Sequence, residues 1–329
     1  MLNQLAVFGS GSWATALVKI FAESGVQVSW LITHPEQREY IRLNGKNPRY
    51  LSFADLDLRF ITIADSAEEI LQEAEVAIFA VPAAYLETYL LDIQPQWFSA
   101  VQPVVSIKGF IPGTGLTPGL YIRKFIRNGK ESIVLGGPCH AEEIARHRNT
   151  YLTIAGREES FVNRIKDSIR TEYIRTVANN DPHGVEYAAI LKNIIGIASG
   201  IASGLNFGDN FQAVLVSNAM REIGQFLNFL SPGNRDLNDS AYFGDMLVTA
   251  YSDFSRNRTL GKLVGRGMQA GKALEFMEMV AEGYHASAEL DPLIRASELH
   301  LPILNGVYRI LHQHANPFHE FRLIEQYLR

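Results

Sequence analysis

The stretch LAVFGSGSWATALVKIF, residues 5–21, predicts the fold of the first half of the chain. An apolar run leads into a glycine-rich turn and then into apolar residues at helical spacing, which is the order strand, tight turn, helix. In such a turn Gly9 permits the bend, Gly11 lets a pyrophosphate approach the backbone, and the N–H groups that begin the helix meet the phosphate charge. We therefore expect a dinucleotide site here, with a purely structural glycine turn as the alternative.

Short apolar runs alternate with helical patterns from this turn onward. Repeated strand and helix predict an α/β fold with an N-terminal Rossmann-like, doubly wound and mostly parallel sheet. In such a sheet ligands bind beyond the carboxyl ends of strands, where Lys108 and residues 136–143 fall. The predicted strands are residues 5–8, 26–32, 61–63, 76–81, 103–107, 132–135, 151–155 and 173–177.

The end of the second strand bears on the choice of dinucleotide. NAD-preferring sites usually place Asp or Glu there, on the ribose hydroxyls. This chain has Thr33 and His34 instead, followed by Arg38 and Arg42. Because no acid would repel a 2′-phosphate, the sequence favours NADPH or the use of both NADP and NAD. For the basic groups, a solvated helix face is the alternative.

The string GGPCHAEE, residues 136–143, turns from a strand into a helix with acids in its first turn. Cys139 is the single cysteine of the chain. Its thiol could be a nucleophile, but hydride transfer needs none, so we expect a small turn residue.

Strand patterns end at residues 179–182, NNDP. The sequence therefore predicts a dinucleotide-binding domain of residues 1–179 and an all-α substrate-binding and catalytic domain of residues 180–329. The second domain opens on EYAAILKNIIGIASGIASG, residues 186–204, in which Lys192 stands among apolar and small residues. Such an ammonium loses hydration, so a partner must meet its charge or its pKa falls toward the range useful for proton transfer. A core helix whose lysine reaches water is the alternative.

The helix face that carries Lys192 continues through small residues, along which another backbone or a ligand could lie close. Asn193 and Glu186 share a neighbouring face. Further on, if residues 245–256 form one helix, Asp245, Thr249, Ser252 and Arg256 line one side of it. The string SRNR, residues 255–258, offers guanidinium and amide donors that suit a phosphate, although an exposed helix end is the alternative.

Composition limits the classes of protein. The chain has 329 residues, 47% hydrophobic side chains, a net charge of −5 and a pI near 6.0, which argues against a general nucleic-acid or anionic-membrane surface. A single cysteine and the absence of a leader pattern indicate a reducing cytoplasm. Apolar runs are broken short of a membrane span, and His312 and His314 lack companions for a metal shell. The oligomeric state stays open, with a homodimer compatible with the sequence.

Taken together, these strings resemble the bacterial-type NAD(P)-dependent glycerol-3-phosphate dehydrogenases over nearly the whole chain. Any one string is weak evidence, but their order and spacing are specific. The strings are GSGSWATA at residues 9–16, VP at 81–82, KG at 108–109, GPCHAEE at 137–143, EYAAILKN at 186–193, GLNFGDN at 204–210, GD at 244–245, SRNR at 255–258 and AEG at 281–283.

The resemblance implies roles for individual residues. Lys192 would be the proton donor and acceptor, coupled to Asp245, with Asn193 beside it. Residues that would hold the glycerol phosphate are Lys108, Gly137, Cys139, Lys192, Asp245, Ser255, Arg256 and Asn257. Residues that would contact the dinucleotide, beside Gly9 and Gly11, are Ser12, Trp13, His34, Lys108, Gly137, Ala141, Arg256, Ala281 and Glu282.

Departures from the family pattern bear on two of these roles. The family commonly has Ser or Thr where Cys139 stands, which questions a substrate hydrogen bond, and often a basic residue at His34, which leaves cofactor preference open. It also usually has two glycines at residues 188–189, where this chain has alanines.

The resemblance implies reversible reduction of dihydroxyacetone phosphate to sn-glycerol 3-phosphate, for phospholipid synthesis. Two other functions stay open. A two-domain NADP-dependent reductase of a 3-hydroxy acid would need a carboxylate site in place of the phosphate clamp. A non-catalytic NAD(P)H-sensing module would bind cofactor without turnover.

Overall fold

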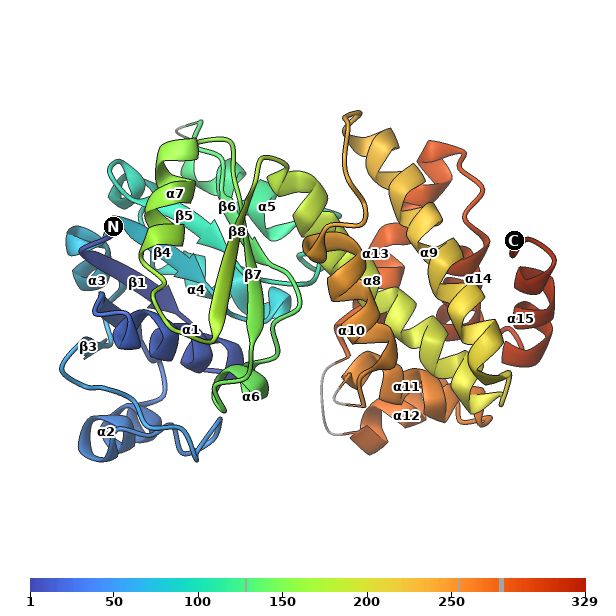
Figure 1. Cartoon of the computed structure of the whole chain (residues 1–329), viewed down its shortest axis with the longest axis horizontal. Helices are drawn as coiled ribbons and strands as arrows, with labels where there is room; N and C mark the ends of the chain where they lie inside the picture. Colours follow the sequence, from blue (N-terminus) through green and yellow to red (C-terminus); the bar gives the residue numbers. More distant parts are fainter. Residues whose placement is uncertain (128, 254, 278–280) are drawn as a thin grey trace. The chain divides into compact units, whose positions relative to one another are not determined.

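The structure is a computed structural model that describes residues 1–127, 129–253, 255–277 and 281–329 (Figure 1). The chain divides into two compact units. The first consists of Met1–Ile107 and Leu116–Val185, and the second of Lys108–Gly115 and Glu186–Arg329. The chain thus passes from the first unit to the second inside helix α8 (Pro182–Gly204), whereas the change of sequence pattern lies just before this helix.

The first unit is built on one eight-stranded sheet with the order β3-β2-β1-β4-β5-β6-β7-β8. Neighbouring strands are parallel except β6 and β7, which pair antiparallel. The prediction of a mostly parallel, doubly wound sheet is confirmed. The strands are β1 (Gln4–Phe8), β2 (Gln27–Leu31), β3 (Ile61–Ala64), β4 (Val76–Phe79), β5 (Gln102–Val105), β6 (Ile133–Gly136), β7 (Thr150–Ala155) and β8 (Ile174–Asn179).

Helices cover this sheet, so its central strands are buried on both faces, as parallel strands require. The apolar face of the first helix explains its packing, because Leu17 and Phe21 are wholly buried. The helices of the first unit are α1 (Ser12–Glu23), α2 (Pro35–Asn44), α3 (Ala67–Glu73), α4 (Leu86–Leu91), α5 (Pro118–Ile126), α6 (Ala141–Ile144) and α7 (Glu159–Asp167), with short 3₁₀ turns η1 (Ala83–Tyr85) and η2 (Pro95–Phe98).

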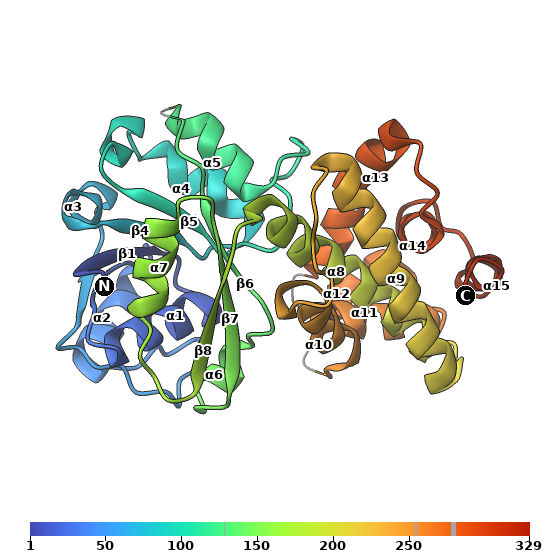
Figure 2. The same cartoon turned by 45° about the horizontal axis from the view of Figure 1, so that its top comes forward.

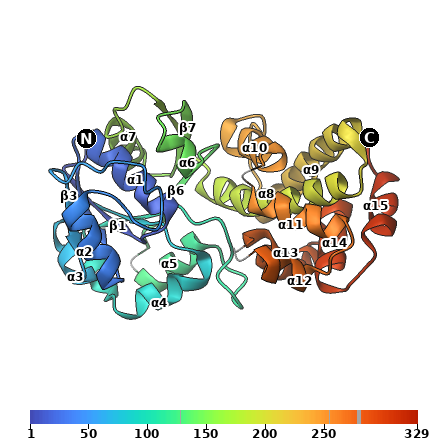
Figure 3. The same cartoon turned by 90° about the horizontal axis from the view of Figure 1, so that it is seen from below.

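The second unit is helical in its described residues, and α8 is its central helix (Figures 2 and 3). By length and hydropathy α8 is the one described helix that could cross a membrane, but its apolar window is 100% buried, as in the core helix of a globular unit. The other elements are α9 (Gly208–Leu230), the π-helical turn η3 (Ser240–Gly244), α10 (Asp245–Tyr251), α11 (Arg256–Gly265), α12 (Ala270–Met277), α13 (Glu282–Ser297), α14 (Pro302–His312) and α15 (Pro317–Glu325).

Glycines let α8 and α11 touch backbone to backbone. A Cβ atom on Gly261 would lie 2.1 Å from the Ile197 carbonyl oxygen, and one on Gly200 would lie 2.2 Å from the Arg258 carbonyl oxygen. The contact repeats one turn later, where a Cβ on Gly204 would lie 2.6 Å from the Lys262 carbonyl oxygen. Gly200 and Gly204 lie beside the small-residue face that carries Lys192. On that face Ser199 donates a hydrogen bond to the Ala250 carbonyl oxygen at 2.6 Å, so a backbone lies close there too.

Residues 245–256 are not one helix, so that expectation was wrong. α10 ends before Ser252, whose backbone is extended (φ −69°, ψ 133°), and α11 begins at Arg256. Ser255 caps α11 by accepting a hydrogen bond from the Arg258 N–H at 3.2 Å. Arg256 therefore occupies the first turn of a helix, at its positive end, and does not extend the face that carries Asp245.

Candidate functional site

The glycine turn after β1 fits a dinucleotide pyrophosphate. Gly9 has a φ of +112°, and a Cβ there would lie 2.5 Å from the Ala80 carbonyl oxygen, so only glycine fits. At Gly11, by contrast, a Cβ would meet nothing within 4 Å, so space is open beside the start of α1. The first turn of α1 has no acidic residue and no side-chain cap. Its N–H end is thus suited to an anion that approaches the backbone closely.

Two side chains that sequence analysis did not single out hold this turn. Gln37 Nε2 and Asn47 Nδ2 each donate to the Ser10 carbonyl oxygen at 3.1 Å. Asn47 is fully buried and also donates to Thr15 Oγ1 at 2.8 Å. The loop after α2 is therefore tied to the glycine turn, although neither polar residue stands in a recognisable motif.

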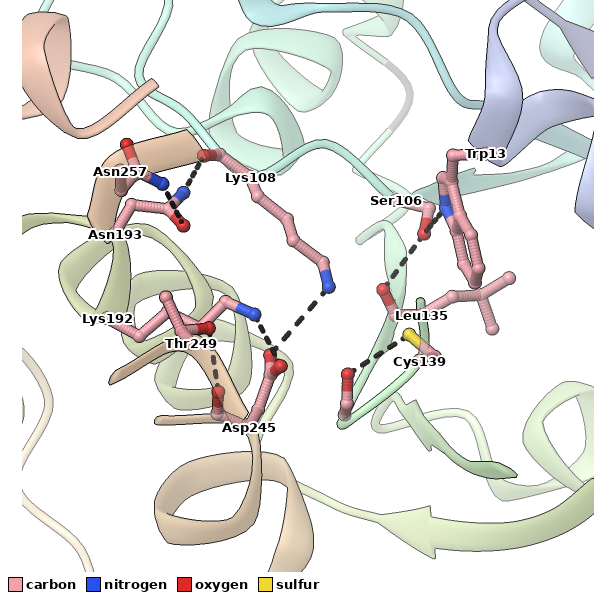
Figure 4. A network of polar contacts seen from close by, with 11 residues as sticks. Trp13, Ser106, Lys108, Leu135, Cys139, Lys192, Asn193, Asp245, Thr249 and Asn257 are labelled. Carbon is pink, nitrogen blue, oxygen red and sulfur yellow. Dashed lines mark hydrogen bonds and ion pairs between the residues drawn. The ribbon is translucent and has the colours of Figure 1, made fainter. Parts of the chain in front are cut away.

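Three further residues predicted to contact the cofactor, Ser12, Trp13 and His34, differ in how they are held. Trp13 Nε1 donates to Ser106 Oγ at 2.7 Å, and Ser106 donates to the Leu135 carbonyl at 3.0 Å, which fixes the indole by the carboxyl ends of β5 and β6 (Figure 4). Ser12 begins α1. His34 is exposed at the N-cap of α2, and its side chain caps nothing.

The arginines after His34 are not simply solvated. Arg38 Nη1 donates to the Ile32 carbonyl at 3.1 Å and pairs with Asp65 at 3.2 Å, while Arg42 Nη2 donates to the Ile63 carbonyl at 2.7 Å. These bonds hold Arg38 by the end of β2, where the ribose of a dinucleotide lies in this fold.

The turn after β6 is tight. Gly137 has a φ of +99°, and a Cβ there would lie 2.9 Å from the Tyr151 carbonyl oxygen. Cys139 is buried, and its thiol donates to the Gly137 carbonyl at 3.0 Å, as fits a small turn residue. Ala141 begins α6 and is also buried.

In the second unit, two ammonium groups converge on one carboxylate (Figure 4). Lys192 donates a hydrogen bond to Asp245 Oδ1, and Lys108 Nζ lies 3.8 Å from Asp245 Oδ2. The Asp245 side chain is 2% exposed, that of Lys192 7% and that of Lys108 24%. The buried Lys192 ammonium is thus accommodated by a charged partner, Asp245, which is one of the two possibilities that the sequence left open. Asp245 Oδ2 is buried and has no hydrogen bond from the described residues, so a hydroxyl donor would suit it.

A chain of amides leads from α13 to Lys108. The Gly283 N–H donates to Asn257 Oδ1 at 2.9 Å, and Asn257 Nδ2 donates to Asn193 Oδ1 at 3.0 Å. Asn193 Nδ2 then donates to the Lys108 carbonyl at 2.9 Å (Figure 4). These bonds fix which end of each amide faces which neighbour. Each Nδ2 carries two hydrogens, and among the described residues Asn257 Nδ2 uses one of them, so the other can serve a ligand.

The start of α11 adds an anion-binding end to this cluster. Arg256 is exposed in the first turn, which contains no acid, and Asn257 beside it is buried. The other arginine of the string, Arg258, pairs with Asp253 at 2.6 Å and is committed to the protein. Arg256 is thus the arginine of this string that suits a phosphate.

Ala281 and Glu282 lie at the start of α13, as its N-cap and its first residue. They directly precede Gly283, which sequence analysis did not assign to the site. Thr249 was likewise unassigned, although its buried hydroxyl donates to the Asp245 carbonyl at 2.8 Å. Its place one helical turn after Asp245 was the available signal.

The predicted residues therefore fall into two groups. The first unit holds Gly9, Gly11, Ser12, Trp13, His34, Gly137, Cys139 and Ala141, and the second holds Lys108, Lys192, Asn193, Asp245, Ser255, Arg256, Asn257, Ala281 and Glu282. Within the second unit, direct contacts join Lys108, Lys192 and Asp245, and also Asn193 and Asn257.

Two family models match successive parts of the chain. A family model described as the N-terminus of NAD-dependent glycerol-3-phosphate dehydrogenase matches residues 4–162, and one described as its C-terminus matches residues 181–321. A glycerol-3-phosphate dehydrogenase (NAD(P)+) of Staphylococcus aureus strain JH9 is 30% identical over 317 residues, which cover 96% of this chain and 95% of the relative. One of Salinibacter ruber is 31% identical over 320 residues, which cover 96% and 92%.

Among solved structures, the glycerol-3-phosphate dehydrogenase of Coxiella burnetii is similar with a TM-score of 0.89 and 24% identity, covering 98% of each chain. At that identity the likeness supports the fold. The two family models and the length of the matches to the relatives support more than the fold. The chain belongs to the NAD-dependent glycerol-3-phosphate dehydrogenase family.

Proposed function

We propose that this protein interconverts dihydroxyacetone phosphate and sn-glycerol 3-phosphate with NAD(P)H or NAD(P)+, and so supplies glycerol phosphate for phospholipid synthesis. The observation that carries the proposal is the convergence of Lys192 and Lys108 on the buried Asp245. Lys192 is joined to the start of α11 through its neighbour Asn193, which bonds Asn257. A proton-transfer group and a phosphate-binding end thus belong to one cluster.

The cofactor would be held by the glycine turn and its neighbours in the first unit. Gly9 and Gly11 would admit the pyrophosphate, and Ser12 and Trp13 would bind beside it. The bound nicotinamide supplies or accepts the hydride. Both NADP and NAD belong to the family's range, and the lack of an acid at the end of β2 favours NADPH. The family pattern adds His34, Lys108, Gly137, Ala141, Arg256, Ala281 and Glu282 to the cofactor contacts.

Lys192 would act as the general acid and base at the substrate's C2 oxygen. In the direction of reduction its ammonium gives a proton to the developing alkoxide, and in the direction of oxidation its amine takes one from the hydroxyl. Asp245 holds the ammonium in place through Oδ1. Lys108 adds a second positive charge nearby, which stabilises negative charge on the oxygen.

The phosphate of the substrate would bind at the start of α11. Arg256 can present two parallel donors to phosphate oxygens, and Asn257 and Ser255 lie beside it. Holding the phosphate orients the reacting carbon and so contributes to the rate. The family pattern also assigns substrate contacts to Gly137 and Cys139.

A substrate panel tests the proposal. Purified protein is mixed with NADPH or NADH, and the absorbance of the reduced nicotinamide is followed on addition of dihydroxyacetone phosphate, unphosphorylated dihydroxyacetone, or the oxidised form of a 3-hydroxy acid. We expect fast oxidation with dihydroxyacetone phosphate, much slower oxidation with unphosphorylated dihydroxyacetone, and none with the oxidised form of the acid. Turnover of the acid's oxidised form would favour the reductase alternative, and cofactor binding without turnover would favour a sensing module.

Replacing Arg256 by lysine is expected to raise KM for dihydroxyacetone phosphate by about tenfold or more, since an ammonium cannot reproduce a two-donor contact with phosphate. KM for unphosphorylated dihydroxyacetone should change little. Arg258→Lys is the matched control, because Arg258 pairs with Asp253 and not with substrate. Equal effects of Arg256→Lys on both substrates would remove Arg256 from the phosphate site.

Gly283→Ala is expected to lower kcat/KM by about tenfold or more, because overpacking a tight contact moves its neighbours. The new Cβ would lie 2.5 Å from the Asn193 carbonyl oxygen and 2.9 Å from Ile197 Cδ1. Asn193 and Asn257 must shift, and Lys108 with them. Steady-state kinetics measures the loss, at a temperature where thermal unfolding shows that both the variant and the unmodified protein are folded. Unchanged kcat/KM would contradict the view that the bonds from Gly283 through Asn257 and Asn193 position Lys108.

Assembly as a homodimer and residence in the cytoplasm are part of the same proposal. Light scattering on the purified protein decides the first, because a dimer has twice the mass of the 36.7 kDa chain. Fractionation of the source cells decides the second.

A further inference from the structure

The segment that carries Lys108 lies between β5 and α5 in the sequence but belongs to the second unit. Apolar side chains anchor its middle, where Phe110 and Ile111 are 3% and 1% exposed. The ring of Phe110 packs edge-on against Tyr187 of α8, with 5.9 Å between centroids. Lys108 therefore depends on packing within the helical unit for its place.

A carboxylate on α13, that of Glu289, binds the C-terminal end of this segment at Gly113 and Gly115. Glu289 Oε1 accepts a hydrogen bond from the Gly113 N–H at 2.6 Å, and Oε2 accepts one from the Gly115 N–H at 3.1 Å. Both glycines have positive φ, 71° and 64°, which other residues rarely adopt. These two left-handed positions, on either side of Thr114, thus turn their N–H groups toward one carboxylate.

The near end of the segment is held by the site itself. Asn193 donates to the Lys108 carbonyl at 2.9 Å, and Lys108 Nζ lies 3.8 Å from Asp245. The segment is thus fastened to α8 at Lys108 and to α13 at Glu289. Asn193 bonds only the carbonyl of Lys108. The direction of the Lys108 side chain therefore also depends on how the residues after it, up to Gly115, are held.

We propose that Glu289 is a positioning residue for Lys108: by binding the Gly113 and Gly115 N–H groups, it fixes the segment that presents Lys108 to Asp245 and to the substrate. The inference rests on the proposed function, because it assigns Lys108 a role in turnover. Glu289 does not touch the reacting atoms. It acts through the backbone of residues 108–115.

Kinetics of two variants at Glu289 test this positioning role. Glu289→Ala removes both acceptors and is expected to lower kcat/KM for dihydroxyacetone phosphate by about tenfold, the size of one hydrogen bond to a charged group at a partly exposed site. Glu289→Gln keeps one acceptor oxygen and should lose about threefold. Glu320→Ala is the control, since Glu320 also accepts two hydrogen bonds, from Arg309 at 3.0 and 2.7 Å, but lies on α15. It should lower thermal stability without changing kcat/KM.

A double-mutant cycle separates positioning from general damage. In a Lys108→Met background, Glu289→Ala should have almost no further effect on kcat/KM, because the group that Glu289 positions is gone. An equal loss in both backgrounds, or no loss in the native one, would overturn the inference.

Hydrogen exchange gives a readout that does not depend on turnover. In Glu289→Ala the amides of residues 108–115 should exchange faster than in the unmodified protein, while those of α15 stay unchanged. Unchanged exchange in residues 108–115 would refute the role of Glu289 in holding this segment. If the amides of residues 108–115 are protected from exchange in the unmodified protein but the protein has no activity with dihydroxyacetone phosphate, the proposed function fails, whereas the contact of Glu289 with the segment is supported.

Discussion

Lys192→Ala is expected to lower kcat for reduction of dihydroxyacetone phosphate by at least about a hundredfold, the lower end for loss of a general acid. The reason is that the ammonium which Asp245 holds would no longer be present to protonate the alkoxide. Binding of NADPH should survive, because the proposed pyrophosphate contacts lie in the first unit. Steady-state kinetics and a fluorescence titration with NADPH measure the two effects separately.

Lys19→Ala is the matched control for this prediction. Lys19 is also a buried lysine with a carboxylate partner, Glu23, but it lies on α1 outside the predicted site. Its loss should reduce stability and leave kcat within about twofold, as expected for a change outside the reacting groups. Near-normal turnover in Lys192→Ala would remove Lys192 from the mechanism.

The second large effect concerns stability. Gly261→Ala is expected to lower the free energy of unfolding by about 3 kcal/mol or more, at the upper end for overpacked sites. The added Cβ would lie 2.1 Å from the Ile197 carbonyl oxygen and 2.8 Å from Gly200 Cα. These are backbone atoms, so α8 and α11 must move apart, and no flexible side chain can make room.

Gly271→Ala serves as its control on the next helix. A Cβ at Gly271 would meet nothing within 4 Å, and alanine favours a helix over glycine, so stability should rise by up to about 1 kcal/mol. Urea unfolding of the two variants gives the comparison. If Gly261→Ala proved as stable as Gly271→Ala, the backbone contact between α8 and α11 would be refuted.

The sheet was predictable from sequence because its strands are short buried runs and its first turn carries a strict glycine pattern. Each predicted strand corresponds to an observed one, and the turn at Gly9 needs its glycine for a measurable steric reason. The antiparallel pairing of β6 with β7 was not predictable in this way, since direction depends on the course of the connecting chain and not on the apolar run itself.

Several of the residues predicted for the site lie in contact with one another, but most of their hydrogen-bond partners were not predictable. The apolar residues around Lys192 in the sequence indicated a buried lysine. Its pairing with Asp245, which the family resemblance implied, is confirmed as a contact. Spacing failed at Arg256, because a helix pattern continues through residues where Ser252 and Ser255 break it. Gly283 and Glu289 contribute through a backbone N–H and a distant loop, and neither leaves a periodic signal.

The central claim is that Lys192 and Arg256 act on the same small phosphorylated substrate. A crystal structure of the protein with a reduced dinucleotide and dihydroxyacetone phosphate tests it most directly. We expect Lys192 Nζ within about 3 Å of the C2 oxygen and the Arg256 guanidinium bonded to the phosphate, at ordinary hydrogen-bond distances. A substrate whose phosphate lies away from Arg256, or whose C2 oxygen has another proton donor, would contradict the account.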